Sequence, residues 1–413
     1  MALEGEGYPK CSSNDTEEEE NFEISAYKKD ACRVITFRLV YKEEDLKSND
    51  VIALTFTPEM AHQVFGESES IFGYRNLSIY LNYLHNSCRC FLDINSRGKL
   101  ESNTMKPDDI EQILDQWLPK NYTTKEDEFI KWIKEEEHDK IYGEILNTIE
   151  KDLKTKYHIT KNDIKDKEFT EFHARFETFI IWFIDAANFI DLEDHRWNIF
   201  YVYEERDNNK TPVGFCTVYM FYAYPSNIRA RVSQFFILPS HQRQGIGTML
   251  YETVSKHLRN MEEVIDITVE EPTPALQRIR DLEDCGILHK TLLENQINFS
   301  TASWKKIFDL GRQKKIGKRQ MRRVYDILSL FYAHDKGPKA SEQVLTGIFN
   351  RIIEETERES RPSKRFRNVK GIPQPSGIDK SQQIEQELRN YCEDIDPSVK
   401  YLQQKLDNWL KMQ

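Results

Sequence analysis

Short runs of β-branched and aromatic residues, each bounded by polar or turn-forming residues, dominate the first third of the chain. The patterns CRVITFRLVY (32–41), LSIYLNYL (77–84) and CRCFLDI (88–94) are typical of β-strands. PDDIEQILDQWL (107–118) has helical spacing instead, with acidic residues in its first turn. We therefore expect a small α+β domain over residues 25–138, after a disordered acidic tail over residues 1–24.

The middle of the chain alternates longer apolar stretches with polar turns. Residues 139–166 are charged and are expected to be helical or irregular. HARFETFIIWFIDAANFI (173–190) predicts one buried helix, because its apolar residues cover most of the circumference. Helices are also predicted after residue 247, up to about residue 258, and in LQRIRDLEDCG (276–286). The predicted strands are WNIFYVYEE (197–205), VGFCTVYMFYAYP (213–225), RVSQFFILP (231–239) and VIDITVEEP (264–272). This order predicts an α/β core over residues 139–285.

Beyond residue 290 the pattern becomes helical. KRQMRRVYDILSLFY (318–332) sets Val324, Ile327, Leu328 and Phe331 opposite a basic face. We expect a helical region over residues 286–335. A basic, Pro- and Ser-rich linker with tail helices should follow over residues 336–413, and the last helix should be interrupted near Pro397.

Two basic runs stand out in this part of the chain, RQKKIGKRQMRR (312–323) and RPSKRFR (361–367). Each is open to two interpretations, as a nuclear import signal or as a charged helix face or tail. The second run is the better candidate for an import signal, because it lies in the Pro- and Ser-rich stretch.

Composition narrows the classes of function. The chain has 413 residues, 39% of them hydrophobic, and a formal charge of −11. Nucleic-acid backbones require a basic face, so direct nucleic-acid binding is not expected and a cationic peptide is a better match. No apolar run approaches the roughly 20 residues that span a bilayer, and no secretory signal pattern begins the chain. The seven cysteines are scattered without metal-ligand spacing, which predicts reduced thiols and no metal site.

The stretch QRQGIGTMLYE (242–252) places two glycines between an apolar strand and an amphipathic helix. It is not a Walker loop, because the required lysine is missing, and Leu250 stands where a Rossmann fingerprint needs a third glycine. It is therefore either an ordinary strand-to-helix turn or a phosphate cradle. The first amides of a helix lack internal partners, and glycine lets a phosphate approach them closely.

The pattern Gln242-x-x-Gly245-x-Gly247 resembles the acetyl-coenzyme A motif of the GNAT superfamily of N-acetyltransferases. Over roughly residues 30–335 the chain is also similar to the catalytic subunits of type B histone acetyltransferases. The stretches that carry this similarity are RVSQFFILPSHQRQGIGTMLYETV, DITVEEP, WFIDAANFIDLEDHRW, FGESESIFGY and RRVYDIL. The resemblance implies an α/β (α+β) fold: a GNAT-type mixed sheet flanked by helices, with acetyl-coenzyme A as the acetyl donor.

The resemblance also implies roles for individual residues. Glu270 is the implied general base, with Glu271 as a substitute; strand alternation puts Glu270 on one face with Asp266 and Thr268. Asp185 is the third candidate, an acid in an apolar stretch where the family carries a glutamate. The implied cofactor-binding residues are Phe235, Phe236, Ile237, Gln242, Arg243, Gln244, Gly245, Ile246, Gly247 and Thr248. The implied substrate-binding residues are Glu67, Glu69, Trp197, Tyr219, Met220 and Phe221.

Two positions depart from the family pattern. Ala275 replaces a serine that contacts the cofactor in the family, and Leu276 replaces a residue that is usually aromatic. One cofactor hydrogen bond and one substrate contact are therefore not expected to carry over.

The implied reaction is acetyl transfer to lysines in the tail of newly made histone four, with histone two A as a further substrate. Direct attack in a ternary complex is expected, because no cysteine has a partner suited to nucleophilic catalysis. The family also implies a WD40 β-propeller histone-binding chaperone as partner, in the nucleus and cytoplasm. Two alternatives stay open: a GNAT enzyme acting on another amine, and a non-catalytic histone-binding scaffold.

Overall fold

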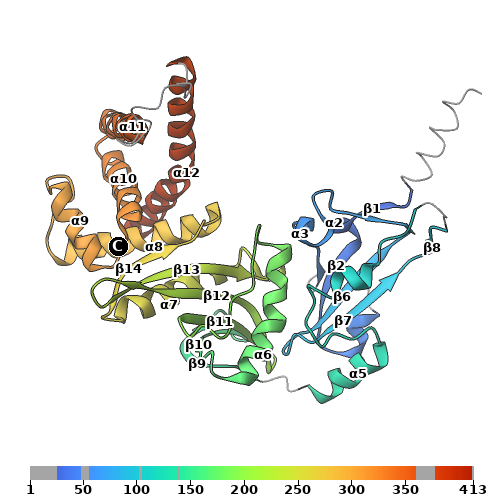
Figure 1. The fold of residues 1–413 in the computed structure, drawn as a ribbon. Helices are drawn as coiled ribbons and strands as arrows, with labels where there is room; N and C mark the ends of the chain where they lie inside the picture. Colours follow the sequence, from blue (N-terminus) through green and yellow to red (C-terminus); the bar gives the residue numbers. More distant parts are fainter. Residues whose placement is uncertain (1–25, 48–54, 102–104, 137–139, 360–376, 412–413) are drawn as a thin grey trace, which may run out of the picture. The chain divides into compact units, whose positions relative to one another are not determined.

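The computed structural model describes residues 26–47, 55–101, 105–136, 140–359 and 377–411 (Figure 1). The chain forms two compact units: Met1–Phe215 with Phe236–Gln244, and Cys216–Phe235 with Gly245–Gln413. The acidic tail predicted for residues 1–24 and the basic run 361–367 lie outside the described residues.

The N-terminal part of the first unit is built on a four-stranded sheet. Its strands follow the order β3 (Thr55–Phe56), β2 (Ile35–Val40), β6 (Ser78–Leu84) and β7 (Cys90–Asn95). β2 and β6 are parallel, and their inward residues are fully buried. The surrounding elements are β1 (Lys28–Asp30) with β4 (Ser70–Phe72), β5 (Tyr74–Arg75) with β8 (Gly98–Lys99), α2 (Ala31–Val34), η1 (Glu43–Leu46), α3 (His62–Phe65), α4 (Ile110–Leu114) and α5 (Glu126–Glu135).

These strands confirm the three predicted from the first apolar runs, with one correction. Residues 31–34 form the helical turn α2 rather than the start of a strand. The Asp30 side chain accepts a hydrogen bond from the Cys32 amide (2.9 Å), which favours the turn over an extended chain.

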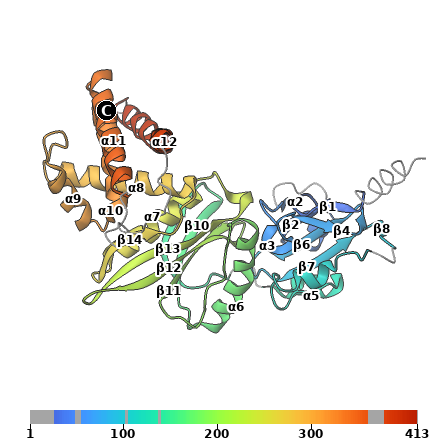
Figure 2. The same ribbon diagram turned by 45° about the horizontal axis from the view of Figure 1, so that its top comes forward.

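The second sheet has six strands in the order β14-β13-β12-β11-β10-β9 (Figure 2). β10 pairs antiparallel with both β9 and β11, whereas β13 and β14 are parallel. The strands are β9 (Glu144–Glu150), β10 (Thr155–Asn162), β11 (Trp197–Arg206), β12 (Asn209–Ala223), β13 (Asn227–Ile237) and β14 (Val264–Val269). All four strands predicted for the core are therefore present, although β14 ends before Glu270.

The expectation of helical or irregular structure over residues 139–166 is wrong, because β9 and β10 lie there. β9 is an edge strand with mostly exposed side chains, so it shows little apolar alternation. β10 buries His158, Thr160 and Asn162, whose polarity hides the strand pattern in the sequence.

The apolar run 173–190 is buried throughout only between Phe176 and Trp182, and it is not one helix; Phe189 near its end is exposed. α6 (Lys167–Phe176) passes directly into the 3₁₀ helix η3 (Glu177–Trp182), and the chain is not helical after Trp182. The buried carboxylate of Glu177 accepts a hydrogen bond from the Ile190 amide (2.9 Å), which fixes the returning chain. Phe172, Phe176 and Trp182 belong to the core.

The second unit ends in packed helices. They are α7 (Ile246–Asn260), α8 (Pro274–Glu294), α9 (Trp304–Gln313), α10 (Lys318–His334), α11 (Pro338–Glu359) and α12 (Gly377–Lys411). α10 packs against α8, α11 and α12, and the four apolar residues predicted for its inner face are buried. None of the helices in the described part of the chain combines the length and apolar character needed to cross a bilayer.

Two expectations for the C-terminal part are wrong. Residues 338–359 form α11 rather than a linker, because Gly337 (φ +95°) and Pro338 start a helix. α12 continues through Pro397 without interruption. Proline there removes one amide donor, but the neighbouring Ile395 and Val399 are buried and keep the helix packed against the core.

Candidate active site

The glycine corner links β13 to α7 through the short helix η4 (Pro239–His241). Two glutamine side chains hold the loop by hydrogen bonds to its own backbone. Gln242 donates to the Ile237 carbonyl (3.0 Å), and Gln244 donates to the Ser240 carbonyl (3.2 Å). Gly245 has φ +83° and directly precedes the first residue of α7, and no side chain caps this helix start. The amides at the start of α7 are thus without a side-chain acceptor of the usual capping kind.

The space over Gly245 is open. A Cβ atom built on Gly245 would meet no atom within 4 Å, so an anion can reach the backbone here. Arg243, also at positive φ (+59°), and Thr248 are exposed beside it, whereas Ile246 is buried and anchors the first turn. These residues suit the diphosphate of acetyl-coenzyme A, which when bound would supply the acetyl thioester.

Residues of the first unit contact the loop through Gln244 and His241. Lys151 donates to the Gln244 side chain (2.7 Å) and Tyr157 donates to the buried Glu204 (3.1 Å). Burial alone would raise the pKa of Glu204, but His241 and the charge of Arg206 outweigh it and lower that pKa. Glu204 is therefore a charged acceptor beneath the loop. Lys151 does not stand out in the sequence, because the strands on either side of it, β9 and β10, lack an apolar pattern.

β13 leaves its neighbour β14 half-way along. The parallel pairing ends at Val232 and Val269, so residues 233–237 have no partner in β14. The Phe236 side chain faces an aromatic core and lies 5.5 Å from Phe183. The Phe235 ring lies edge-on to Tyr251 (6.4 Å). Phe235 and Phe236 of this half-strand thus pack against other aromatic rings, while the backbone edge on the side of β14 has no partner in that strand.

Glu270 lies where β14 ends, beside this unpaired half of β13. Its carboxylate accepts a hydrogen bond from the Ser233 hydroxyl (2.8 Å) and lies 3.8 Å from Arg231, with about half of the side chain exposed. Its amide donates to the Val232 carbonyl (2.9 Å), which fixes the backbone. The next residue, Glu271, is exposed and has φ +34°.

Arg231 connects the carboxylate to an aromatic group. Its guanidinium lies 4.7 Å from the centre of the Phe221 ring, which is 4.5 Å from the Tyr219 ring. Phe221 is 37% exposed, whereas Met220 is buried on the opposite face of β12. The predicted residues Tyr219, Phe221 and Glu270 therefore lie in one cluster of the second unit. Arg231 and Ser233 were not among the predicted site residues, although as residues two apart they share one face of β13, the strand beside β14.

The other predicted carboxylates belong to the first unit. Asp185 is not inside a helix as expected; it follows η3, and its side chain is 78% exposed and lies 3.0 Å from His62. Glu69 accepts hydrogen bonds from the amides of Ala61 (2.6 Å) and His62 (3.0 Å). The His62 ring thus lies between Asp185 and Glu69, an arrangement that the sequence analysis missed.

Glu67 and Trp197 are the remaining predicted substrate residues. Glu67 is exposed, and Trp197 begins β11, half-buried. Among the residues that the structure describes, no group of three or more His, Cys, Asp or Glu side chains gathers as a metal site.

The departures from the family pattern lie at the start of α8. Ala275 is exposed and Leu276 is buried in the first turn, which the Thr273 side chain caps (3.3 Å to the Leu276 amide). Ala275 has no polar group to offer a cofactor, and Leu276 serves the core.

Comparison with known proteins decides the family. The family model described as "Histone acetyl transferase HAT1 N-terminus" matches residues 27–185, and "Acetyltransferase (GNAT) family" matches residues 157–279. The histone acetyltransferase type B catalytic subunit of Homo sapiens is 31% identical over 83% of this chain and 84% of its own length. The corresponding Mus musculus protein is 34% identical over 74% of this chain and 76% of its own length.

The chain belongs to the family of type B histone acetyltransferase catalytic subunits. It is an acyltransferase with the predicted mixed α/β GNAT fold. Solved acetyltransferase structures also match, among them an aminoglycoside acetyltransferase from a soil metagenomic sample. That structure is 21% identical over 28% of this chain and 78% of its own chain, with a TM-score of 0.21.

Proposed function

We propose that this protein transfers acetyl from acetyl-coenzyme A to lysines in the N-terminal tail of newly synthesised histone four, with histone two A as a second substrate. Family membership supports the histone substrate. The observation that carries the reaction is the position of Glu270, at the end of β14 beside the half of β13 that β14 leaves unpaired.

The chain's own residues would hold the donor in two ways. The first amides of α7, with Gly245 at their entrance, bind the diphosphate, and Gln242 and Gln244 keep the loop in shape. The unpaired backbone edge at Phe235, Phe236 and Ile237 binds the extended arm of the donor, as an added strand would.

The difficult step is removal of a proton from the lysine. A free lysine amine has a pKa near ~10.4 and is mostly protonated at neutral pH, so a base must act before or during attack. Glu270 takes this proton, either directly or through one water. Ser233 and Arg231 hold its carboxylate in place, and Glu271 is the substitute.

Negative charge then develops on the thioester oxygen. A backbone N–H of β13 can hold that charge at little cost, because it is already oriented by the sheet. The Gln234 amide donates to the Thr217 hydroxyl (3.0 Å), so the next residues of the strand are the better candidates. The lysine nitrogen forms the new bond to the acetyl carbon, the carbon–sulfur bond breaks, and the leaving thiolate takes the remaining proton of the attacking nitrogen, which yields the free thiol and the acetylated lysine.

Acidic and aromatic groups support recognition of a basic tail. Glu67 and Asp185 are exposed carboxylates, and Phe221 with Tyr219 offers an aromatic surface for the aliphatic part of lysine. On the family resemblance we also propose Trp197 as a contact of the tail, and Met220, buried on the opposite face of β12, as support for the strand that carries Tyr219 and Phe221. Glu69 supports recognition indirectly, because its carboxylate is engaged by the amides of Ala61 and His62. A WD40 β-propeller histone chaperone as partner, and a nuclear and cytoplasmic location, follow from the family resemblance alone.

The base is tested by Glu270→Gln. We expect kcat on a histone four tail peptide to fall by about a hundredfold to ten-thousandfold, while calorimetry shows unchanged acetyl-coenzyme A binding. Glu271→Gln removes the same charge one residue away and should lower kcat by less than about threefold. The assignment is wrong if the single variants and the double variant all keep their turnover.

The same assay separates the alternatives. An enzyme for another amine would acetylate a small polyamine more efficiently than the histone four peptide. A non-catalytic scaffold would bind the peptide without turning it over. No structural observation favours either alternative over the proposed reaction.

A further inference from the structure

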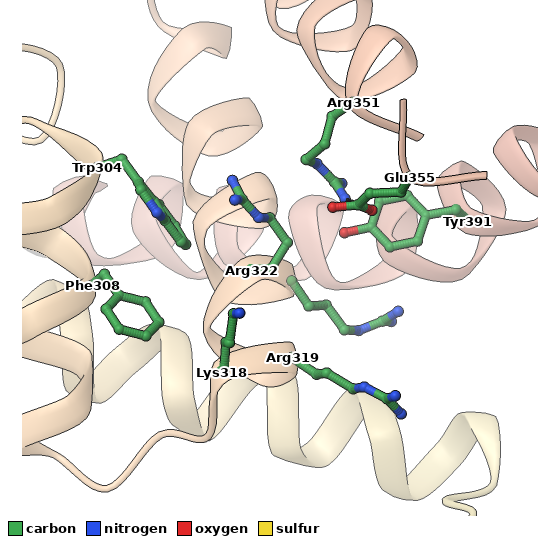
Figure 3. Close-up of a pocket in the computed structure, with 9 residues that line it drawn as sticks. Trp304, Phe308, Lys318, Arg319, Arg322, Arg351, Glu355 and Tyr391 are labelled. Atoms are coloured by element: carbon green, nitrogen blue, oxygen red, sulfur yellow. Dashed lines mark hydrogen bonds and ion pairs between the residues drawn. The ribbon is translucent and has the colours of Figure 1, made fainter. Parts of the chain in front are cut away.

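The C-terminal helices of the second unit form a cavity that the proposed reaction does not use. Its volume is about 700 Å³, and its walls come from α9, α10, α11 and α12 (Figure 3). We call it the basic pocket. It is lined by Trp304, Phe308, Lys318, Arg319, Arg322, Arg323, Arg351, Glu355 and Tyr391.

Two of its five cations are neutralised by the protein itself. Arg323 pairs with the buried Asp281 (2.7 Å) and with Asp394 (2.6 Å). Arg351 pairs with the buried Asp326 (2.6 Å) and with Glu355 (2.8 Å). These pairs tie α8, α10, α11 and α12 together.

Lys318, Arg319 and Arg322 are different. Within the described part of the chain, none of them has an acidic group within 4.0 Å. All three lie in the first turns of α10, where the helix dipole disfavours positive charge, and Lys318 and Arg322 are like charges four residues apart. The protein tolerates this arrangement although it costs stability, and a bound anion would remove that cost.

This charge is not a product of overall composition. Residues 303–334 contain nine Lys and Arg against two Asp, in a chain whose formal charge is −11. Part of this excess is the run 312–323, one of the two possible import signals. The run is folded rather than extended: Ile316 and Met321 within it are buried in the helical core.

Aromatic rings border the cations. The Arg322 guanidinium lies 4.0 Å from the centre of the Trp304 ring, and Phe308 lies 5.5 Å from Trp304. Figure 3 shows Trp304 and Phe308 on the α9 side, with Lys318 and Arg322 between them and Arg351. A fitting ligand therefore combines several negative charges with an apolar or aromatic group.

We propose that the basic pocket is a docking site for an acidic peptide segment of a partner protein. Carboxylates of that segment pair with Lys318, Arg319 and Arg322, and a neighbouring aromatic side chain packs on Trp304 and Phe308. A protein segment is favoured over nucleic acid because the cations converge on one cavity, whose lining also includes the acidic Glu355, rather than following an extended track. The site is independent of acetyl transfer.

The test uses the full chain and a fluorescein-labelled peptide of four Glu, one Phe and four Glu, with binding followed by fluorescence anisotropy. We expect saturable binding that weakens at least twentyfold in Lys318→Glu/Arg319→Glu and at least fivefold in Trp304→Ala. The matched control is Lys305→Glu/Lys306→Glu on the exposed face of α9, outside this pocket. It makes the same charge change and should weaken binding by less than threefold.

Further arms of the experiment distinguish ligand classes. Replacing Glu by Gln in the peptide should abolish binding, and replacing Phe by Gly should weaken it at least fivefold. A thymidine nonamer and inorganic phosphate should compete poorly. The proposal is overturned if the two double variants lose affinity equally, or if the oligonucleotide or phosphate displaces the peptide at lower concentration than unlabelled peptide. Unchanged circular dichroism and acetyl-coenzyme A binding confirm that each variant is folded.

Discussion

Gly245 illustrates how much of the site depends on a single backbone conformation. Its φ of +83° is one that residues with a Cβ rarely adopt, and the space above it is open. A glycine corner is predictable here from the sequence, because a strand, two glycines and a helix follow one another. Whether the corner is a plain turn or a phosphate cradle cannot be decided from these residues without the family resemblance.

Two substitutions at this position separate strain from obstruction. Gly245→Ala adds a Cβ at a strained φ, whereas asparagine tolerates the left-handed region. Both side chains would project into the open space where a phosphate would approach, so we expect acetyl-coenzyme A affinity to fall at least tenfold in both variants. Only Gly245→Ala should also lower the melting temperature measurably. Calorimetry measures the affinity, and thermal unfolding measures the melting temperature. Wild-type acetyl-coenzyme A affinity in Gly245→Asn would show that this loop is not part of the donor site.

Other residues of the site could not be predicted from the sequence, for a physical reason. His62 lies between Asp185 and Glu69 only because the segment that follows η3 packs against α3. His62 and Asp185 are more than a hundred positions apart in the sequence. Lys151 reaches Gln244 in the same way. Arg231 was within reach of pattern reasoning, since it lies on the strand beside β14, opposite Thr268, and alternation puts Glu270 on the same face as Thr268.

At the scale of elements, the contact between α7 and α8 includes a titratable group outside the site, Glu283 of α8. Burial first, and then the nearby Glu252 carboxylate, raise the pKa of Glu283 to about 7. Its ordinary value is 4.5, so between these values the folded protein binds more protons than the unfolded chain. Stability is therefore lost as the pH rises from about 4.5 to 7, and Glu283 destabilises the fold most above pH 7.

Glu283→Gln should remove this pH-dependent cost. Because Glu283 is partly exposed and solvent screens its charge, we expect the free energy of unfolding to rise by only about 1 kcal/mol at pH 8. This corresponds to a rise in melting temperature of about 2 °C. The gain should shrink as the pH falls and vanish below about 4.5. Thermal unfolding across this pH range measures it. Glu294→Gln, an exposed position on the same helix, should show no such trend; a gain that stays constant with pH would contradict the shifted pKa.

The elements themselves were predictable where an apolar run bounded by polar residues marks a strand, as in β2, β6, β7 and β11 to β14, or where one face of a helix is apolar and the other polar, as in α7, α8 and α10. Burial on both faces, as in β11, did not hide the strand, because the apolar run itself is the signal. β9 and β10 were not predictable in this way, because an edge strand with exposed side chains and a strand that buries polar groups both lack the expected alternation. α11 was missed because Gly337 and Pro338 resemble linker residues although here they start a helix. These signals become clear only when tertiary contacts are known.

On the scale of the whole molecule, charge is distributed unevenly. The chain carries −11 overall, yet residues 303–334 are strongly basic, and exposed acids such as Glu67 and Asp185 lie in the other unit. A basic histone tail should therefore be attracted by the protein's overall field as well as by local contacts. Such attraction is long-ranged, and dissolved salt screens it.

Salt dependence then distinguishes a peptide enzyme from one that recognises only an amine. Raising the salt from about 0.1 M to 1 M shortens the screening length from about 10 Å to about 3 Å. With acetyl-coenzyme A saturating, we expect kcat/KM for the histone four tail peptide to fall about tenfold, mainly through a higher KM, because acid–base contacts weaken while the buried chemistry does not. A small substrate with a single amine should lose less than about twofold, since it has one charge for the field to act on. If both substrates respond equally, the acids do not recognise a basic tail, and the alternative of another amine substrate gains the support that the structure has not given it.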